Sequence, residues 1–410
     1  MKILLVHQNF PGQFLHLAPA LKARGHEVLA LTAETNGRAP DTTIARYRWS
    51  EAEEDKITGP GAGFARAAFR GGRAARAAAQ LRDRHGFVPD VIFGHSGWGE
   101  TLFLNEVWPQ ARMLAYAELM YRTTGLDTDF DAEFQTPDLD SRITTSGRRA
   151  HMLQAMIDAD AAVAPTAFQA GTFPAELLAK IRVIHDGVDT ARVRPDPQAR
   201  LTLPNGRVLA PGDEVLSFVN RRLDPYRGFH VLMRALPEVM AARPEAQVVL
   251  VGDDGRGYGG LPRDAASWRE KMLAEVGDRL DLSRVHFLGR VPYPTYLSLL
   301  QVSRVHAYLT YPFVLGWSMV EAMAAGCALV ASRTAPVQEA VTDGVEARLV
   351  DFFDIPGWSQ ALTAALADPA SMQPLRLAAR ARALRDYDLR SRCLPAMIDF
   401  VEGRVRSQTL

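Results

Sequence analysis

The amino-acid sequence predicts two doubly wound α/β domains, each built on a parallel sheet and both Rossmann-like, followed by a helical tail. Short continuous apolar runs such as Ile3–Val6 are typical of strands buried on both faces of a parallel sheet. Helical patterns separate these runs. The alternation stops in a proline-rich stretch and then restarts, so the 410 residues divide into two similar halves.

The first half, residues 1–190, is predicted as an N-terminal Rossmann-like domain. A helical pattern through Leu15–Leu21 ends at Arg24-Gly25. Further strands are expected at Glu27–Leu31, Asp90–Phe93, Met113–Ala117, Ala161–Ala164 and Arg182–Ile184. Residues 191–213 contain four prolines and show poor periodicity, so they are predicted as a linker.

Residues 214–385 are predicted as a second Rossmann-like domain, and residues 386–410 as a helical tail that would pack back on the first. The expected strands are Val215–Val219, Gln247–Val251, Val285–Leu288, Val305–Leu309 and Ala328–Ala331. Ligands bind beyond the carboxyl ends of strands in such sheets. Two such domains facing each other would therefore place a ligand cleft between them.

Composition narrows the class of protein. Acidic and basic side chains balance at 47 each, so nothing in the net charge points to a nucleic-acid partner. Two cysteines, Cys327 and Cys393, make neither a disulfide framework nor a zinc site, which favours a cytoplasmic location. The N-terminal apolar run is too short for a signal peptide, and no stretch is long enough to cross a bilayer, so membrane contact would be peripheral.

Two segments of the second half carry candidate ligand-binding chemistry. Arg221, Arg222 and Arg227 follow a predicted strand and precede a helix, where guanidinium groups and helix amides suit a diphosphate. The second segment, Pro312–Gly326, leads from a loop into a helix. Its candidate ligand-binding residues are Phe313, Leu315, Gly316 and Trp317 in the loop and Glu321 in the helix, where a carboxylate amid apolar residues would suit ribose hydroxyls.

Several motifs, in the same order along the chain, resemble glycosyltransferase family 4. The helix segment is similar to the family's Glu, seven residues, then Glu-Ala-Met-Ala-x-Gly, and Arg222–Gly228 resembles its Arg-Leu…Pro-x-Lys-Gly. Other similar stretches are Arg24–Val28, Arg182–Asp189 and Val285–Pro292. The resemblance implies a GT-B fold, a UDP-, GDP- or ADP-sugar as donor substrate with no other cofactor, transfer with retention, and no metal.

The resemblance also implies residue roles. Arg222 and Arg227 would contact the diphosphate, Gly316 would help the helix start receive it, and Glu321 would bind the ribose. Phe287 and Leu288 would hold the base through their backbone. Two departures stand out: Phe313 occupies the place of the family's first Glu, and Arg221 the place of a Gly.

The first half offers His95 and Glu118, each just after a predicted strand, and Gly12 in the loop after the first strand. His95 is a candidate for donor-sugar contact. Glu118 is a candidate base toward an acceptor hydroxyl or an ion-paired loop residue. The acceptor would be a glycan, a lipid-linked molecule or a small molecule.

Other patterns are weighed against these. Asp127 and Asp129 match an Asp-x-Asp metal motif, but an acceptor-side loop is the better interpretation. Arg66, Arg70, Arg73 and Arg76 share a face of the predicted helix Ala65–Arg84; a solvent-facing helix is favoured over a lipid-binding one.

A nucleotide-sugar epimerase and a non-catalytic sugar-nucleotide binding protein remain alternatives. A dehydrogenase would need Gly-x-Gly-x-x-Gly after the first strand, which His7–Gly12 lacks.

Overall fold

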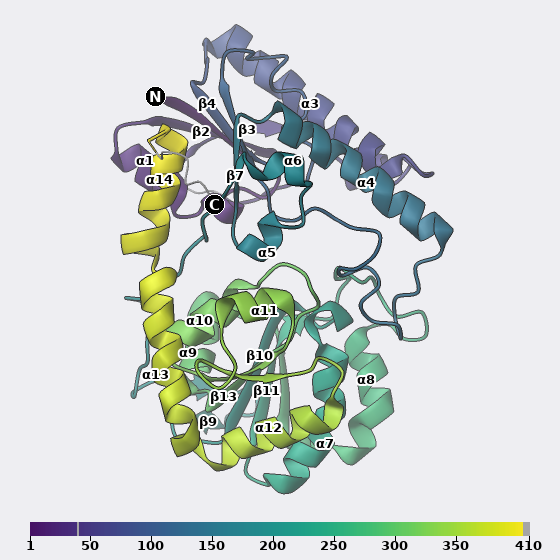
Figure 1. Cartoon of the computed structure of the whole chain (residues 1–410), viewed down its shortest axis with the longest axis vertical. Coiled ribbons are helices and arrows are strands. Elements are labelled where there is room, and N and C mark those ends of the chain that lie inside the picture. The colour runs from purple at the N-terminus through teal and green to yellow at the C-terminus, as the bar shows by residue number, and fades with distance from the viewer. Residues whose placement is uncertain (39–40, 405–410) are drawn as a thin grey trace. The chain divides into compact units, whose positions relative to one another are not determined.

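The computed structural model describes residues 1–38 and 41–404, which form two compact units. The first unit is Met1–Asp186 together with the chain from Arg390 onward, and the second is Gly187–Leu389 (Figure 1). None of the helices in the described part of the chain is long and apolar enough to cross a membrane.

The first unit is built on a seven-stranded parallel sheet of order β3-β2-β1-β4-β5-β6-β7. Successive strands run outward from β1 in one direction and from β4 in the other, so the switch point lies between β1 and β4. The doubly wound prediction is confirmed for this half. The strands are β1 (Lys2–Val6), β2 (Glu27–Ala33), β3 (Thr43–Tyr47), β4 (Val91–His95), β5 (Arg112–Tyr116), β6 (Ala161–Ala164) and β7 (Ile181–Val183).

Helices cover this sheet: α1 (Leu17–Ala23), α2 (Glu51–Glu54), α3 (Ala62–His85), α4 (Leu139–Asp158), α5 (Ala167–Ala170), α6 (Ala175–Leu178) and α14 (Leu394–Glu402). The two long helices, α3 and α4, pack against each other (Figure 1). The arginines of α3 do not form a uniform free face, because Arg70 donates two hydrogen bonds to Glu54 at 2.6 and 2.9 Å and Arg66 donates to the carbonyl of Ile57.

The end of the chain returns to the first unit through α14. Met397, Phe400 and Val401 are buried in the same apolar cluster as Leu17 and Leu21 of α1. Glu402 accepts hydrogen bonds from Arg24 and His26, both at 2.8 Å. These ion-paired bonds hold the pKa of Glu402 at about 2.

The second unit has a six-stranded parallel sheet of order β12-β11-β10-β13-β14-β15, with its switch point between β10 and β13. The strands are β10 (Val215–Arg222), β11 (Gln247–Asp253), β12 (Val285–Gly289), β13 (Val305–Tyr308), β14 (Ala328–Ser332) and β15 (Arg348–Val350). The helices are α7 (Phe229–Ala242), α8 (Trp268–Val276), α9 (Tyr293–Val302), α10 (Trp317–Ala325), α11 (Ala335–Ala340), α12 (Ile355–Ala367) and α13 (Pro369–Asp386).

The segment predicted as a linker is instead part of the second unit. It contains a two-stranded antiparallel pair, β8 (Leu201–Thr202) and β9 (Val208–Leu209). Val193, Leu203 and Leu209 are buried in the unit's main apolar cluster. Strands of two residues are too short to produce a periodic pattern, which is why prolines dominated the sequence interpretation.

Candidate active site

Three charged residues meet at the carboxyl ends of neighbouring strands in the second unit. Arg222 ends β10, Asp253 ends β11 and Arg290 directly follows β12. Both arginines donate to the same carboxylate oxygen of Asp253 at 2.7 Å. Two guanidinium groups thus share one carboxylate, which leaves a net positive charge where an anion could bind. The neighbouring Arg221 is exposed.

Arg227 lies at the β10–β13 switch point, where it contacts residues that follow β13. It ends a short 3-10 helix, Pro225–Arg227, and donates to the hydroxyl of Thr310 at 2.8 Å and to the carbonyl of Val314 at 2.9 Å. One nitrogen, Nη1, makes both bonds. The guanidinium group is therefore held through one nitrogen, while its other N–H donors remain available for a ligand.

Asp224 is a buried carboxyl beneath these arginines, and the sequence interpretation did not single it out. It accepts from the backbone N–H groups of Arg227 at 3.3 Å and Tyr258 at 3.2 Å. Burial raises the pKa of Asp224 to about 6, although the charge of Arg227 lowers it. The site can therefore change its own charge near neutral pH.

Phe313 belongs to an aromatic cluster. Only 3% of its surface is exposed, and its ring lies 4.7 Å from that of Tyr258 and 5.5 Å from that of Tyr226. The Arg227 guanidinium lies over the Phe313 ring, 5.6 Å from its centre. Phe313 thus supports Arg227 from below. Leu315 is also buried, at 8% exposed.

The start of α10 is the helix terminus expected to receive phosphates. Gly316 is its N-cap, and no side chain caps the first turn. The amide of Gly316 donates to the Tyr308 hydroxyl at 2.7 Å, so it is already used. The next amides of the first turn are the ones that a helix start offers to an anion. Trp317 is 46% exposed beside them.

Glu321 on α10 has two tyrosine partners from α9. Its two carboxylate oxygens accept hydrogen bonds from the hydroxyls of Tyr293 and Tyr296, each at 2.7 Å. Burial raises the pKa of Glu321, and the two hydrogen bonds lower it. The tyrosines fix the carboxylate, whose remaining lone pairs can still accept from ribose hydroxyls.

Phe287 and Leu288 lie on β12, the edge strand of the six-stranded sheet. One side of an edge strand carries backbone groups that are not paired within the sheet, as backbone recognition of a base requires. The guanidinium of Arg269 lies 4.2 Å from the centre of the Phe287 ring and adds a flat cation beside this edge.

In the first unit, His95 ends β4 at the switch point. Its ring stacks on Tyr116 at 5.4 Å, and Trp98 lies at the same distance. Nδ1 accepts from the amide of Gly97 at 3.0 Å, so Nε2 carries the proton of the neutral ring. That nitrogen lies 3.5 Å from a carboxylate oxygen of Glu118.

Glu118 follows β5, the strand beside β4, and thus lies at the same edge as His95. Its other carboxylate oxygen accepts from the Gln13 amide at 3.3 Å. Its backbone carbonyl accepts from Gln169 at 2.7 Å. The structure brings these two predicted residues together. The carboxylate of Glu118 has the chemistry to act as a base toward a hydroxyl group.

His7, which directly follows β1, completes this cluster and was missed by the sequence interpretation. Its ring lies 5.8 Å from that of His95. Burial and the charge of His95 hold the pKa of His7 at about 3. A β-carbon at Gly12, where φ is +49°, would lie 2.6 Å from the His7 ring, so a glycine is needed there.

The alternative metal motif has a local structural role. Both carboxylate oxygens of Asp129 accept from the amide of Gly125, at 2.8 and 2.9 Å. Among the described residues, no group of three or more His, Cys, Asp or Glu could hold a metal ion.

The functional residues that the sequence interpretation missed differ in whether a local sequence pattern could have revealed them. His7 directly follows β1 and Asp253 ends β11, so the rule that selected His95 and Arg222 would also have selected them. Tyr293 and Tyr296 depend on the packing of α9 beside α10, which no local pattern shows.

Two family models match this chain. Residues 24–193 match the model described as "Glycosyl transferase family 4 group", and residues 205–383 match "Glycosyl transferases group 1". Together they cover most of both units.

Curated relatives are similar over part of their length. A D-inositol 3-phosphate glycosyltransferase of Nocardia farcinica is 31% identical over 237 residues, 56% of this chain and 50% of the relative. A GDP-mannose-dependent alpha-(1-6)-phosphatidylinositol monomannoside mannosyltransferase of Mycolicibacterium smegmatis is 28% identical, over 50% and 52%. The matched region therefore spans about half the length of these relatives.

Solved structures share the fold. Sucrose-phosphate synthase from Thermosynechococcus elongatus has a TM-score of 0.71 at 18% identity, covering 98% of each chain. Anabaena HepE, in complex with UDP and glucose, has a TM-score of 0.67 at 16% identity, covering 98% of this chain and 100% of that one.

Proposed function

We propose that this chain, which belongs to the glycosyltransferase family 4 group and has the GT-B fold, transfers a sugar from a nucleoside-diphosphate sugar to the hydroxyl group of an acceptor. The observation that carries the proposal is the positive cluster of the second unit. Arg222, Arg227 and the uncapped start of α10 lie at the switch point of one parallel sheet.

This cluster suits the chemistry of the leaving group. When the bond between the anomeric carbon and the diphosphate breaks, negative charge grows on the β-phosphate. Fixed guanidinium groups and helix amides stabilise that charge without reorganising, and one such donor is typically worth about 10²–10³ in rate. This supply of positive charge supports a transfer that needs no metal ion.

The rest of the donor has matching groups. Glu321, held by its two tyrosines, would bind the ribose, and the edge of β12 at Phe287 and Leu288 would bind the base. The mannosyltransferase among the relatives is named for GDP-mannose, and the HepE structure contains UDP. We therefore propose a donor in which the sugar is linked to UDP, GDP or ADP.

On the first unit, His95 would contact the transferred sugar and Glu118 would act toward the acceptor hydroxyl. Retention of the anomeric configuration is part of the proposal and rests on family membership. The acceptor would be a glycan, a lipid-linked molecule or a small molecule, as the range of relatives suggests.

Phe313 favours a second candidate, a non-catalytic sugar-nucleotide binding protein. The family's first Glu is replaced here by a buried aromatic residue, so one carboxylate expected near the sugar is lacking. Such a protein would bind the donor without releasing nucleoside diphosphate.

Isothermal titration calorimetry with UDP, GDP and ADP tests the donor site. Arg222→Met should weaken the preferred nucleotide at least about tenfold, since a hydrogen bond to a charged group is worth about 1.5–3 kcal/mol. Arg279→Met, at an exposed arginine that ends the 3-10 helix Gly277–Arg279 of the same unit, is the matched control and should change the affinity by less than about threefold. Equal effects of the two variants would contradict the assignment.

A further inference from the structure

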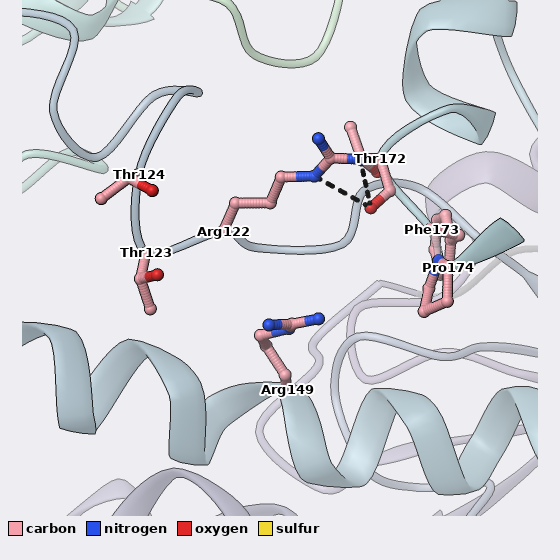
Figure 2. Close-up of a pocket in the computed structure, with 7 residues that line it drawn as sticks. All are labelled: Arg122, Thr123, Thr124, Arg149, Thr172, Phe173 and Pro174. Atoms are coloured by element: carbon pink, nitrogen blue, oxygen red, sulfur yellow. Dashed lines mark hydrogen bonds between the residues drawn. The ribbon is translucent and has the colours of Figure 1, made fainter.

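A pocket of about 320 Å³, lined in part by two arginines and three threonines, lies in the first unit near the loop that follows β5. Figure 2 shows its lining: Arg122, Thr123, Thr124, Arg149, Thr172, Phe173 and Pro174. Arg122 comes from the loop and Arg149 from α4, and both extend beside the same open space (Figure 2). None of these lining residues carries a carboxylate.

Arg122 is held in a fixed orientation. Nη2 donates to the carbonyl of Gly171 at 2.8 Å, and Nε and Nη2 share the carbonyl of Thr172 at 3.4 and 3.3 Å. Carbonyl groups hold this guanidinium without neutralising its charge. Its remaining nitrogen, Nη1, is available to a ligand.

Arg149 is the less satisfied of the two. Its Nε is buried and has no hydrogen-bond partner within the described part of the chain. A buried donor on a charged group that lacks an acceptor is costly, and two guanidinium groups beside one space repel each other. A bound anion would remove both penalties at once.

The pocket is tied to the proposed acceptor side of the site. The Gln169 side chain donates to the carbonyl of Glu118, and the Thr172 hydroxyl donates to the carbonyl of Gln169, both at 2.7 Å. The amide of Met120 donates to the same Thr172 hydroxyl at 2.8 Å. Glu118 and Arg122 are only four residues apart, so their backbones lie within about 14 Å.

We propose that this pocket binds a phosphate monoester group of the acceptor, with Arg122 and Arg149 as its charged contacts and Thr123 as a hydroxyl contact. The proposal rests on the proposed function, because it names the class of acceptor whose hydroxyl would lie at Glu118. A phosphate offers several charged oxygens to guanidinium groups approaching from two elements, which a neutral glycan does not.

Binding of defined probes tests the pocket separately from transfer. Calorimetry would use inorganic phosphate and glycerol 3-phosphate, and sedimentation would use phosphatidic acid vesicles against phosphatidylcholine vesicles. We expect at least about tenfold weaker binding of the phosphate probe in Arg149→Met and a smaller loss in Thr123→Val. Binding of glycerol 3-phosphate or inorganic phosphate would indicate a small acceptor, and binding of phosphatidic acid vesicles alone would indicate a lipid-linked one. Either result supports the phosphate subsite if it depends on Arg149.

Arg142→Met is the matched control, since Arg142 is exposed on the same helix and outside the pocket. Its affinity for the probes should equal that of the wild type. An equal loss in Arg142→Met, unchanged binding in Arg149→Met, or no binding of any probe would overturn the proposal. So would phosphate binding that disappears in Arg222→Met but not in Arg149→Met. Nucleotide binding, measured alongside, should stay unchanged in Arg149→Met, so this proposal can fail while the donor site stands.

Discussion

Single side chains set the charge around the proposed donor phosphates. Arg227 is anchored to Thr310 and Val314 on one side and lies over Phe313 on another. An uncharged ring beneath a guanidinium leaves its full charge for the ligand, whereas a carboxylate there would compete with the phosphate. We therefore expect the departure at position 313 to act on the proposed donor through Arg227.

Phe313→Glu tests this role. The new carboxylate should pair with Arg227, lower the rate of nucleoside diphosphate release about tenfold or more and change the ranking of donor sugars. Phe313→Leu, which removes the ring without adding charge, should change both much less. Initial rates with several donors measure the effect, and identical behaviour of the two variants would show that Phe313 serves packing alone.

His7 predicts a pH dependence of stability. With a pKa of about 3 in the folded state and an ordinary value of about 6.5 when unfolded, His7 binds fewer protons in the folded protein between these values. The free energy of unfolding should therefore fall as the pH falls from about 6.5 toward 3, by up to about 1.4 kcal/mol per pH unit from this group.

His7→Asn should reduce that slope, measured by urea denaturation at a series of pH values. His85→Asn is the comparison, since that side chain is exposed at the end of α3 in the same unit. An unchanged slope in His7→Asn would mean that the ring is protonated in the folded state.

Helices and strands differ in how far local sequence determines them. Strands β1 and β2 were predicted within two residues because buried parallel strands are continuous apolar runs. Strand β3 was missed, because an edge strand with half-exposed residues lacks that pattern. Arg222, Arg227, His95 and Glu118 could be predicted since each follows a strand, while the tyrosine partners of Glu321 depend on tertiary packing.

Helix α14 is predicted to be required for the stability of the first unit. Phe400 is 2% exposed, and its ring lies 5.8 Å from that of Phe93, two residues before His95 on β4. Phe400→Ala should cost about 3–5 kcal/mol of unfolding free energy. Leu15→Ala, at a residue 52% exposed in the same unit, should cost less than about 1 kcal/mol. Similar values for both variants in denaturant titrations would refute a core role for α14.

At the scale of the whole molecule, the two-sheet plan followed from the rhythm of apolar runs and its restart after residue 213. The chain joins the second unit at Gly187 and leaves it at Leu389, each within four residues of the predicted boundaries at 190 and 385, but residues 191–213 belong to that unit and are not a separate linker. Prolines and weak periodicity mark irregular backbone, but they do not show which unit buries it. The amide of Val188 donates to the carbonyl of Tyr387, and the amide of Leu389 donates to the carbonyl of Val188. These bonds pair residues about 200 apart in sequence.

The most direct test of the account is a panel of UDP-, GDP- and ADP-sugars incubated with the purified chain, with release of nucleoside diphosphate measured with and without a chelator. The account predicts release from one donor class, unchanged by the chelator and lost in Arg222→Met. Donor binding without release would support the non-catalytic candidate, and a strict need for divalent metal would contradict the metal-independent mechanism. No binding of any donor would contradict the central claim that the second unit is a nucleotide-sugar site.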